Sequence, residues 1–244
     1  MQLKQFIGVT ALFASIATAV PINKEFCGTE DSVQYGDYNV YNNLVGRSKS
    51  GTQCTRLIKT GQTDNVGWST TWSWSGEEKK IKSFANAAYH FEPKVISDIK
   101  SILINWNWST GGVVKKSNVA LELYTYASPE DSEKDYDYKI SIWLGKTGST
   151  KPLGNRLDSP IFSTGDGNEY QIYIGYNGVQ NVVTFVATKQ VKEFDGDAFS
   201  FIRHLIDTDH FPDSQVLGAI RGGITAYVGD KATFTTKSFQ VSVN

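Results

Sequence analysis

The chain has 244 residues, of which 40% are hydrophobic, 13% aromatic and 20% charged. This composition is too apolar for a disordered chain and is typical of a globular protein with a large core. The formal net charge is −1 and the chain contains no basic run, which argues against a nucleic-acid-binding protein. Only three histidines and two cysteines occur, so we expect neither a His/Cys metal site nor a cofactor.

The N-terminal segment is typical of a secretory signal peptide. Lys4 supplies a positive charge, the stretch from Phe6 to Ala19 is apolar, and Ala17-Thr18-Ala19 has the small-x-small form of a cleavage site. We therefore expect residues 1–19 to be removed and residues 20–244 to form a single secreted domain. The apolar stretch is too short to span a bilayer, so the sequence does not predict a membrane protein.

The two cysteines, Cys27 and Cys54, are expected to form a disulfide, because the bond is the usual state of a cysteine pair in a secreted protein. It would close a loop of slightly under thirty residues and stabilise the fold by roughly 3.5 kcal/mol in the chain-entropy model. Two free, buried thiols are the alternative.

Three segments alternate with the period of two that is typical of β-strands, namely 119–125, 138–144 and 220–228. The alternation predicts that one face of each strand packs against a second sheet while the other faces outward. The residues predicted on the outward faces are Glu122, Tyr124, Lys139, Ser141, Trp143, Arg221, Thr225 and Tyr227. Such a mixture of aromatic and polar side chains suits sugar binding, and a surface with a few exposed aromatic rings is the alternative interpretation.

One segment has the period of a helix. Its apolar residues are spaced at i, i+3, i+4, i+7 and i+8, and they are Ala198, Phe201, Ile202, Leu205 and Ile206. Asp195 or Asp197 can cap its start, and Pro212 lies beyond its end. We expect this helix to support the sheet rather than to carry chemistry.

Two charged segments are interpreted as turns. The acidic stretch 128–137 resembles a calcium loop, but Tyr136 stands where such a loop needs glycine and Lys134 intrudes. A solvated hairpin tip is therefore the preferred interpretation. The run 77–82, Glu-Glu-Lys-Lys-Ile-Lys, is interpreted as a turn of mixed charge.

A series of short motifs extends across nearly the whole mature chain. The motifs are Phe26-Cys27-Gly28, Tyr41-Asn42-Asn43-Leu44, Gly51-Thr52-Gln53-Cys54-Thr55, Trp72-Ser73-Trp74-Ser75-Gly76, Lys82-Ser83-Phe84-Ala85-Asn86-Ala87, Ile142-Trp143-Leu144, Pro152-Leu153-Gly154 and Phe185-Val186-Ala187-Thr188. In this order the chain resembles glycoside hydrolase family 12, the secreted endo-β-1,4-glucanases and xyloglucanases. The resemblance implies an all-β jelly-roll sandwich of two antiparallel sheets, with a concave glucan cleft and one short supporting helix.

The resemblance also implies where the catalytic groups would lie. Family members are retaining glycosidases, which use a nucleophile and an acid whose carboxyl groups are about 5 to 5.5 Å apart. Segment 138–144 resembles the strand of the nucleophile and places Lys139 at that position, while segment 222–229 places Thr225 at the position of the acid. Glu122 occupies the position of a helper aspartate. The chain is thus interpreted as a divergent member that lacks both catalytic glutamates.

The substrate-binding residues implied by the resemblance are Asn42, Trp68, Trp143, Pro152 and Tyr227. Two other positions depart from the family pattern. Val45 replaces an aromatic platform, and Ser141 replaces a methionine. We therefore expect glucan binding to be weak.

Hydrolysis is disfavoured by the charge of the lysine. The transition state is oxocarbenium-like, and an ammonium about 4 Å away would raise its energy by roughly 4 kcal/mol at an effective dielectric constant of 20. That is about three decades in rate, and Thr225 has no proton acidic enough to assist the leaving group. We expect Lys139 to form an ion pair with Glu122 across adjacent strands.

Three hypotheses for the function follow. The first is a secreted, monomeric and catalytically inactive relative that binds β-1,4-glucan or xyloglucan weakly, or acts as a decoy for proteins that recognise active members. The second is an active endo-β-1,4-glucanase or xyloglucanase that uses relocated carboxylates. The third is a purely protein-binding, elicitor-like surface. None of the three involves a nucleic acid or a membrane.

Overall fold

The computed structural model describes residues 25–46, 51–128 and 136–244. The expected signal peptide, residues 1–19, and most of the acidic segment 128–137 lie outside the described residues. Within the described part of the chain, no helix is long and apolar enough to cross a membrane.

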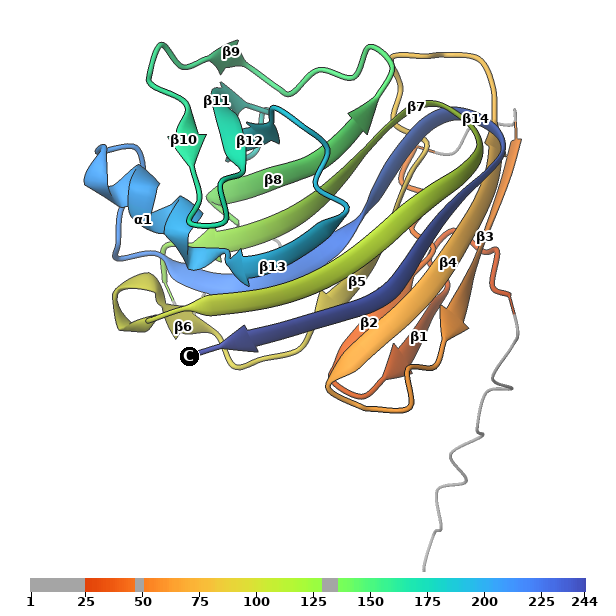
Figure 1. The fold of residues 1–244 in the computed structure, drawn as a ribbon, viewed down its shortest axis with the longest axis horizontal. Helices are drawn as coiled ribbons and strands as arrows, with labels where there is room; N and C mark the ends of the chain where they lie inside the picture. The colour runs from red at the N-terminus through yellow and green to blue at the C-terminus, as the bar shows by residue number, and fades with distance from the viewer. Residues whose placement is uncertain (1–24, 47–50, 129–135) are drawn as a thin grey trace, which may run out of the picture.

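The described residues form mainly β-strands (Figure 1). The strands in the first half are β1 (Ser32–Tyr35), β2 (Tyr38–Tyr41), β3 (Gly51–Ile58), β4 (Asn65–Trp74), β5 (Ser83–Tyr89), β6 (Lys94–Val95) and β7 (Ile102–Tyr126). Those in the second half are β8 (Tyr138–Thr147), β9 (Asn155–Arg156), β10 (Phe162–Ser163), β11 (Glu169–Tyr176), β12 (Asn181–Ala187), β13 (Glu193–Asp197) and β14 (Val216–Val243). The helices are η1 (Ile96–Asp98), a 3₁₀ turn, and α1 (Phe199–Asp207).

Two long strands, β7 and β14, pass through both layers of the sandwich (Figure 1). They pair antiparallel over nearly their whole length, and the register shifts between Ala226 and Thr233, where the strands bend. In one layer they are flanked by β13 and by β4 with β3; in the other they are flanked by β8 with β12 and β11, and by β5 with β2 and β1. The expected all-β jelly-roll is therefore confirmed.

One pairing departs from the expectation of purely antiparallel sheets. Strand β12 runs parallel to β8, with Val182 beside Lys139 and Thr184 beside Ser141. A parallel neighbour requires a crossover connection, and the chain supplies one because it passes through β9, β10 and β11 before it enters β12.

The alternation of the three predicted strands agrees with the structure. Leu121, Leu123, Ile140, Ile142, Leu144, Ile220, Ile224 and Ala226 belong to the main hydrophobic core, which lies between the layers. Their neighbours in sequence lie on the opposite face of the sheet. The predicted two-sided strands are therefore confirmed, and the outward face contains the candidate site.

The predicted helix is confirmed as α1, at one end of the sandwich (Figure 1). Asp197 Oδ1 accepts the main-chain N–H of Phe199 at 2.9 Å and that of Ile102 at 2.8 Å, so this residue joins the helix start to β7. Phe201 packs edge-on against Phe185 and Tyr170, with ring centroids 5.0 and 4.9 Å apart. The helix thus covers one end of the core, as expected of a supporting element.

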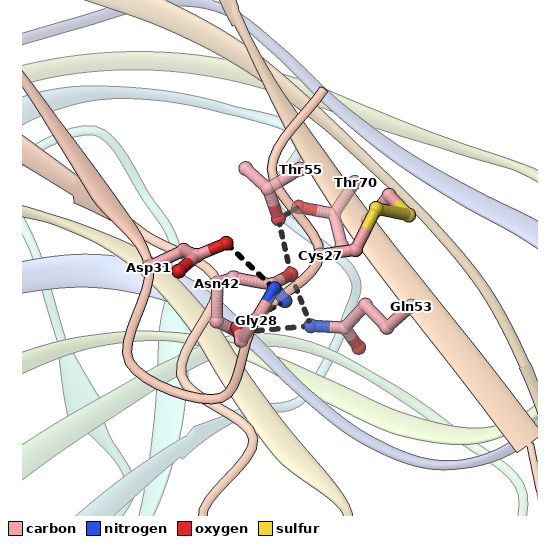
Figure 2. The surroundings of a disulfide bond; sticks show 8 residues. Cys27, Gly28, Asp31, Asn42, Gln53, Thr55 and Thr70 are labelled. Carbon is pink, nitrogen blue, oxygen red and sulfur yellow. Dashed lines mark hydrogen bonds between the residues drawn. A yellow bond between two sulfur atoms is a disulfide. The ribbon is translucent and has the colours of Figure 1, made fainter. Parts of the chain in front are cut away.

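The expected disulfide between Cys27 and Cys54 is present (Figure 2). It attaches the N-terminal segment to β3, and the main chains of Phe26 and Thr55 exchange two hydrogen bonds beside it, each 2.9 Å long. The described residues contain no free cysteine.

Candidate functional site

A pocket of about 300 Å³ lies on the outward face of the sheet, over the neighbouring strands β14, β7, β8 and β12. Its lining residues are Ile81, Asn118, Glu122, Lys139, Ser141, Trp143, Lys151, Pro152, Leu153, Val182, Thr184, Thr225 and Tyr227. Residues two apart on one strand point to the same face, which explains why Lys139, Ser141 and Trp143 reach the pocket together. We call this pocket the cleft.

The cleft brings together most of the residues that the resemblance singled out. Lys139, Thr225 and Glu122, which the resemblance assigns to the nucleophile, acid and helper positions, all line it. So do Trp143, Pro152 and Tyr227, three of the five expected substrate-binding residues. Segments more than 100 residues apart in sequence thus meet at one place, because β14 and β8 flank β7 in this layer.

Lys139 and Glu122 form the expected ion pair. The distance between Lys139 Nζ and Glu122 Oε1 is 3.3 Å, and Glu122 is only 6% exposed. In the register of β7 and β8, Glu122 lies opposite Ser141 and Lys139 lies opposite Tyr124, so the two charged residues are diagonal neighbours. Their long side chains span this diagonal.

The other oxygen of Glu122 is also occupied, because the hydroxyl of Tyr124 donates a hydrogen bond to Oε2. The guanidinium carbon of Arg221 lies 5.1 Å from the centroid of the Tyr124 ring, and Arg221 is directly opposite Glu122 in the register of β14 and β7. Burial raises the pKa of Tyr124 well above its usual value, and the negative charge of Glu122 raises it further. Tyr124 is therefore a neutral hydrogen-bond donor at neutral pH.

Two aromatic rings, those of Tyr227 and Trp143, line the cleft. Burial raises the pKa of Tyr227, and the charge of Glu122 is the second cause. Trp143 lies across the cleft and donates a hydrogen bond from Nε1 to Ser141 Oγ at 3.1 Å. Both rings are less than 10% exposed, so each offers a sugar only a small part of its surface.

Among the described residues that line the cleft, Glu122 is the only carboxylate. Glycoside hydrolysis by the retaining or the inverting route uses two carboxyl groups that flank the scissile bond. The lining therefore offers a basic amine, hydroxyls, amides and one paired carboxylate. Within the described residues, no group of three or more His, Cys, Asp or Glu side chains is placed to hold a metal ion.

Two expected substrate-binding residues are not in the cleft, and their assignment was wrong. Asn42 is fully buried beside the disulfide, where Nδ2 donates to the carbonyl of Gly28 and Oδ1 accepts hydrogen bonds from Gln53 and Thr55 (Figure 2). Its polar groups are thus used within the fold.

Trp68 is fully buried as well, in the main hydrophobic core. Its ring stacks on that of Trp106 at a centroid distance of 6.5 Å and meets Phe239 edge-on at 6.0 Å. Because its side chain has no exposed surface, Trp68 stabilises the sandwich and does not contact a ligand.

Several cleft residues were missed by the analysis of the sequence. Asn118 lies four residues before Glu122 on the same strand, so the period-two alternation, extended back from Glu122, would have placed Asn118 on the same face. Thr184 lies beside Ser141 in the parallel pairing, which no local pattern predicts. Lys151 and Leu153 flank the expected Pro152, and both line the cleft with it.

Comparison with known proteins agrees with this geometry. Residues 36–244 match the family described as Glycosyl hydrolase family 12. The chain belongs to this family. Its relatives include a probable xyloglucan-specific endo-beta-1,4-glucanase A of Aspergillus terreus, 36% identical over 100% of this chain and 98% of the relative. The xyloglucan-specific endo-beta-1,4-glucanase A of Emericella nidulans is also 36% identical, over 95% of this chain and 97% of the relative.

Solved structures of the family have the same fold. Endoglucanase 3 of Trichoderma harzianum, from family GH12, superposes with a TM-score of 0.85 and 27% identity over 93% of this chain and all of that chain. The catalytic domain of Humicola grisea Cel12A, solved in complex with a soaked thio cellotetraose, gives a TM-score of 0.84 and 26% identity over 91% of this chain and 99% of that chain.

Proposed function

We propose that this family 12 protein binds a β-1,4-glucan such as xyloglucan in the cleft without hydrolysing it by the two-carboxylate mechanism. The observation that carries the proposal is the ion pair of Lys139 with Glu122. It occupies the one carboxylate of the described cleft lining and places an ammonium where the family resemblance implies a nucleophile.

The ligand class is inferred from the family and from the lining. The relatives named above carry xyloglucan in their names, and the Humicola grisea structure contains a cello-oligosaccharide analogue. Trp143, Tyr227 and Pro152 supply apolar surface for sugar rings, while Asn118 and Thr184 supply groups that hydrogen-bond hydroxyls. Because the two rings are mostly covered and Val45 replaces an aromatic platform, we expect weak binding.

The absence of hydrolysis is inferred from electrostatics. Positive charge develops on the sugar in the transition state, and the Lys139 ammonium opposes it. Glu122 cannot act as both nucleophile and acid, and its two oxygens are engaged by Lys139 and Tyr124. Thr225, at the position of the acid, does not release a proton near neutral pH.

We also propose that the protein is secreted. The Cys27–Cys54 disulfide supports this, because such bonds persist in oxidising compartments, and the signal-like segment 1–19 is in agreement.

The experiment is a pair of assays on the purified protein. Reducing ends are measured after incubation with xyloglucan and mixed-linkage glucan, and we expect none above the buffer control. Hydrolysis that disappears in Glu122→Gln would instead establish an active enzyme with a relocated carboxylate.

Binding is measured by affinity electrophoresis in gels that contain xyloglucan. We expect weak retardation that Trp143→Ala abolishes, while Tyr176→Ala, a control at an exposed ring outside the cleft, leaves it unchanged. No retardation by any glucan would refute the proposal and favour a protein-binding surface.

A further inference from the structure

A second and larger pocket, of about 890 Å³, adjoins the cleft. Its lining residues are Glu77, Glu78, Lys79, Lys80, Lys116, Ser149, Lys151 and Tyr227. We call it the lysine pocket. Tyr227 and Lys151 line both the cleft and the lysine pocket, so the two spaces adjoin at these side chains. A chain molecule that lies along the cleft would therefore extend into the lysine pocket.

One of the two carboxylates in the described lining of the lysine pocket is compensated by lysines. The carboxylate of Glu77 lies 3.6 Å from Nζ of Lys82, which is fully buried, and 3.9 Å from Nζ of Lys80. The other carboxylate is that of Glu78.

Three ammonium groups of the lysine pocket have no carboxylate partner in the described part of the chain. Lys116 donates to the main-chain carbonyl of Glu78 at 2.7 Å, and its Nζ lies 4.9 Å from the centroid of the Tyr227 ring. Within the described residues, no carboxylate oxygen lies within 4.0 Å of the Nζ atom of Lys79, Lys116 or Lys151. The lining therefore has four lysines against two glutamates, in a chain whose formal net charge is −1.

This local excess of positive charge distinguishes the lysine pocket from a site for a neutral sugar. A neutral glucan needs hydrogen bonds and apolar surface, and neither requires unpaired ammonium groups. An anionic group in the lysine pocket would accept hydrogen bonds from these ammonium groups and would neutralise their charge. The adjoining rings of Tyr227 and Trp143 favour a ligand whose other part is a sugar.

We propose that the cleft and the lysine pocket together bind a β-1,4-linked glycan that carries carboxylate groups, such as one with uronic acid units. The neutral rings lie against Trp143 and Tyr227, and a carboxylate is held by Lys116 and Lys151. This inference rests on the proposed function, because it requires a glycan in the cleft. It adds that the preferred glycan is acidic.

The test compares two soluble celluloses with the same backbone, the anionic carboxymethyl cellulose and the neutral hydroxyethyl cellulose. Dissociation constants are obtained from affinity electrophoresis at low ionic strength. We expect the wild-type protein to bind carboxymethyl cellulose roughly three- to tenfold more tightly, the range for two partly exposed charge pairs. The preference should disappear in 1 M salt, where the Debye length is about 3 Å.

Substitutions of lysine test which residues cause the preference for the anionic cellulose. Lys116→Gln/Lys151→Gln should lose the preference, measured as the ratio of the dissociation constants of the same variant for the two celluloses, whereas the control Lys189→Gln/Lys237→Gln, which removes two exposed lysines outside both pockets, should keep the wild-type ratio. Lys151→Gln alone alters only an exposed side chain, so it reports on the preference even if the change at Lys116 disturbs Tyr227.

The outcomes separate this inference from the proposed function. Equal binding of the two celluloses would overturn the acidic-glycan inference and leave the proposed function standing. Failure to bind either cellulose would overturn both. Equally tight binding of polygalacturonate, whose backbone is different, would show backbone-independent attraction of polyanions and would also overturn the inference.

Discussion

The ammonium of Lys139 lies 3.3 Å from a carboxylate oxygen of Glu122, although the two residues are diagonal rather than directly opposite on β8 and β7. The pair is largely buried, so each charge depends on the other for compensation. The neighbouring strand thus supplies the acid that compensates the charge of this lysine.

A double-mutant cycle measures this dependence. We expect Lys139→Met to lower the free energy of unfolding by about 1–3 kcal/mol, because it removes the ammonium that compensates the buried carboxylate of Glu122 and leaves the hydrogen bond from Tyr124 in place. In Lys139→Met/Glu122→Gln the loss should be smaller than the sum of the single losses by about 0.5 kcal/mol or more. Urea denaturation at pH 7 provides the values, and additive effects within about 0.3 kcal/mol would contradict the coupling.

Replacement of Lys139 and Thr225 by glutamate tests the proposal that these positions correspond to the catalytic acids of active family members. In Lys139→Glu/Thr225→Glu, two carboxylates would line the cleft together with Ser141 and Asn118, and we expect reducing ends to be released from xyloglucan. Each single variant should stay inactive, because the mechanism needs both groups. If the double variant folds and binds glucan but does not cleave it, the cleft differs from that of active members in more than the two acids.

The two asparagines Asn42 and Asn118 should respond in opposite ways to substitution. Asn42→Ala removes a side chain with three hydrogen bonds in the buried network of Figure 2, and we expect a loss of about 2–3 kcal/mol of stability with unchanged glucan binding per folded molecule. Asn118→Ala should weaken retardation in xyloglucan gels with a smaller change in stability. If folded Asn42→Ala lost glucan binding, Asn42 would be a substrate-binding residue after all, contrary to its buried position in the structure.

Alkaline pH should destabilise the protein partly through Tyr170. Burial raises the pKa of this phenol above the usual 10.0, so between about pH 10 and its higher pKa the folded state retains a proton that the unfolded chain releases. Stability therefore falls as the pH rises in this range. Because the buried hydroxyl of Tyr170 has no hydrogen-bond partner among the described residues, Tyr170→Phe should cost little stability at pH 7 and flatten the fall in stability above pH 10. Urea denaturation at pH 7 and pH 11 tests this, with the exposed Tyr176→Phe as a control that should retain the wild-type slope.

The sequence predicted which face of a strand each side chain occupies better than it predicted which strands pair with one another. Period-two alternation placed Glu122, Lys139 and Thr225 on one face, and the cleft confirms it. The alternation could not show that β7 and β14 bend and continue into the second layer, because the bend depends on pairing between segments far apart in sequence. Nor could it show the parallel pairing of β12 with β8.

The errors at Asn42 and Trp68 arose because residues were transferred by motif without regard to burial. In β4 the even-numbered residues from Val66 to Trp74 are all buried, and the recurrence of tryptophan at Trp68, Trp72 and Trp74 was visible in the sequence. That period would have placed Trp68 in the core. No pattern in the sequence predicted the lysine pocket, because its charged residues come from three separate segments of the chain.

The position of β14 in the middle of the topology has a consequence for biosynthesis. This strand is the hydrogen-bonded neighbour of β4, β5, β6 and β7, which all precede it by more than 85 residues. Neither layer can close until the segment that ends at Val243 has left the ribosome. The apolar strand faces of the nascent protein therefore stay uncovered until β14 has been synthesised, and the slow formation of such distant contacts exposes the protein to aggregation during this interval.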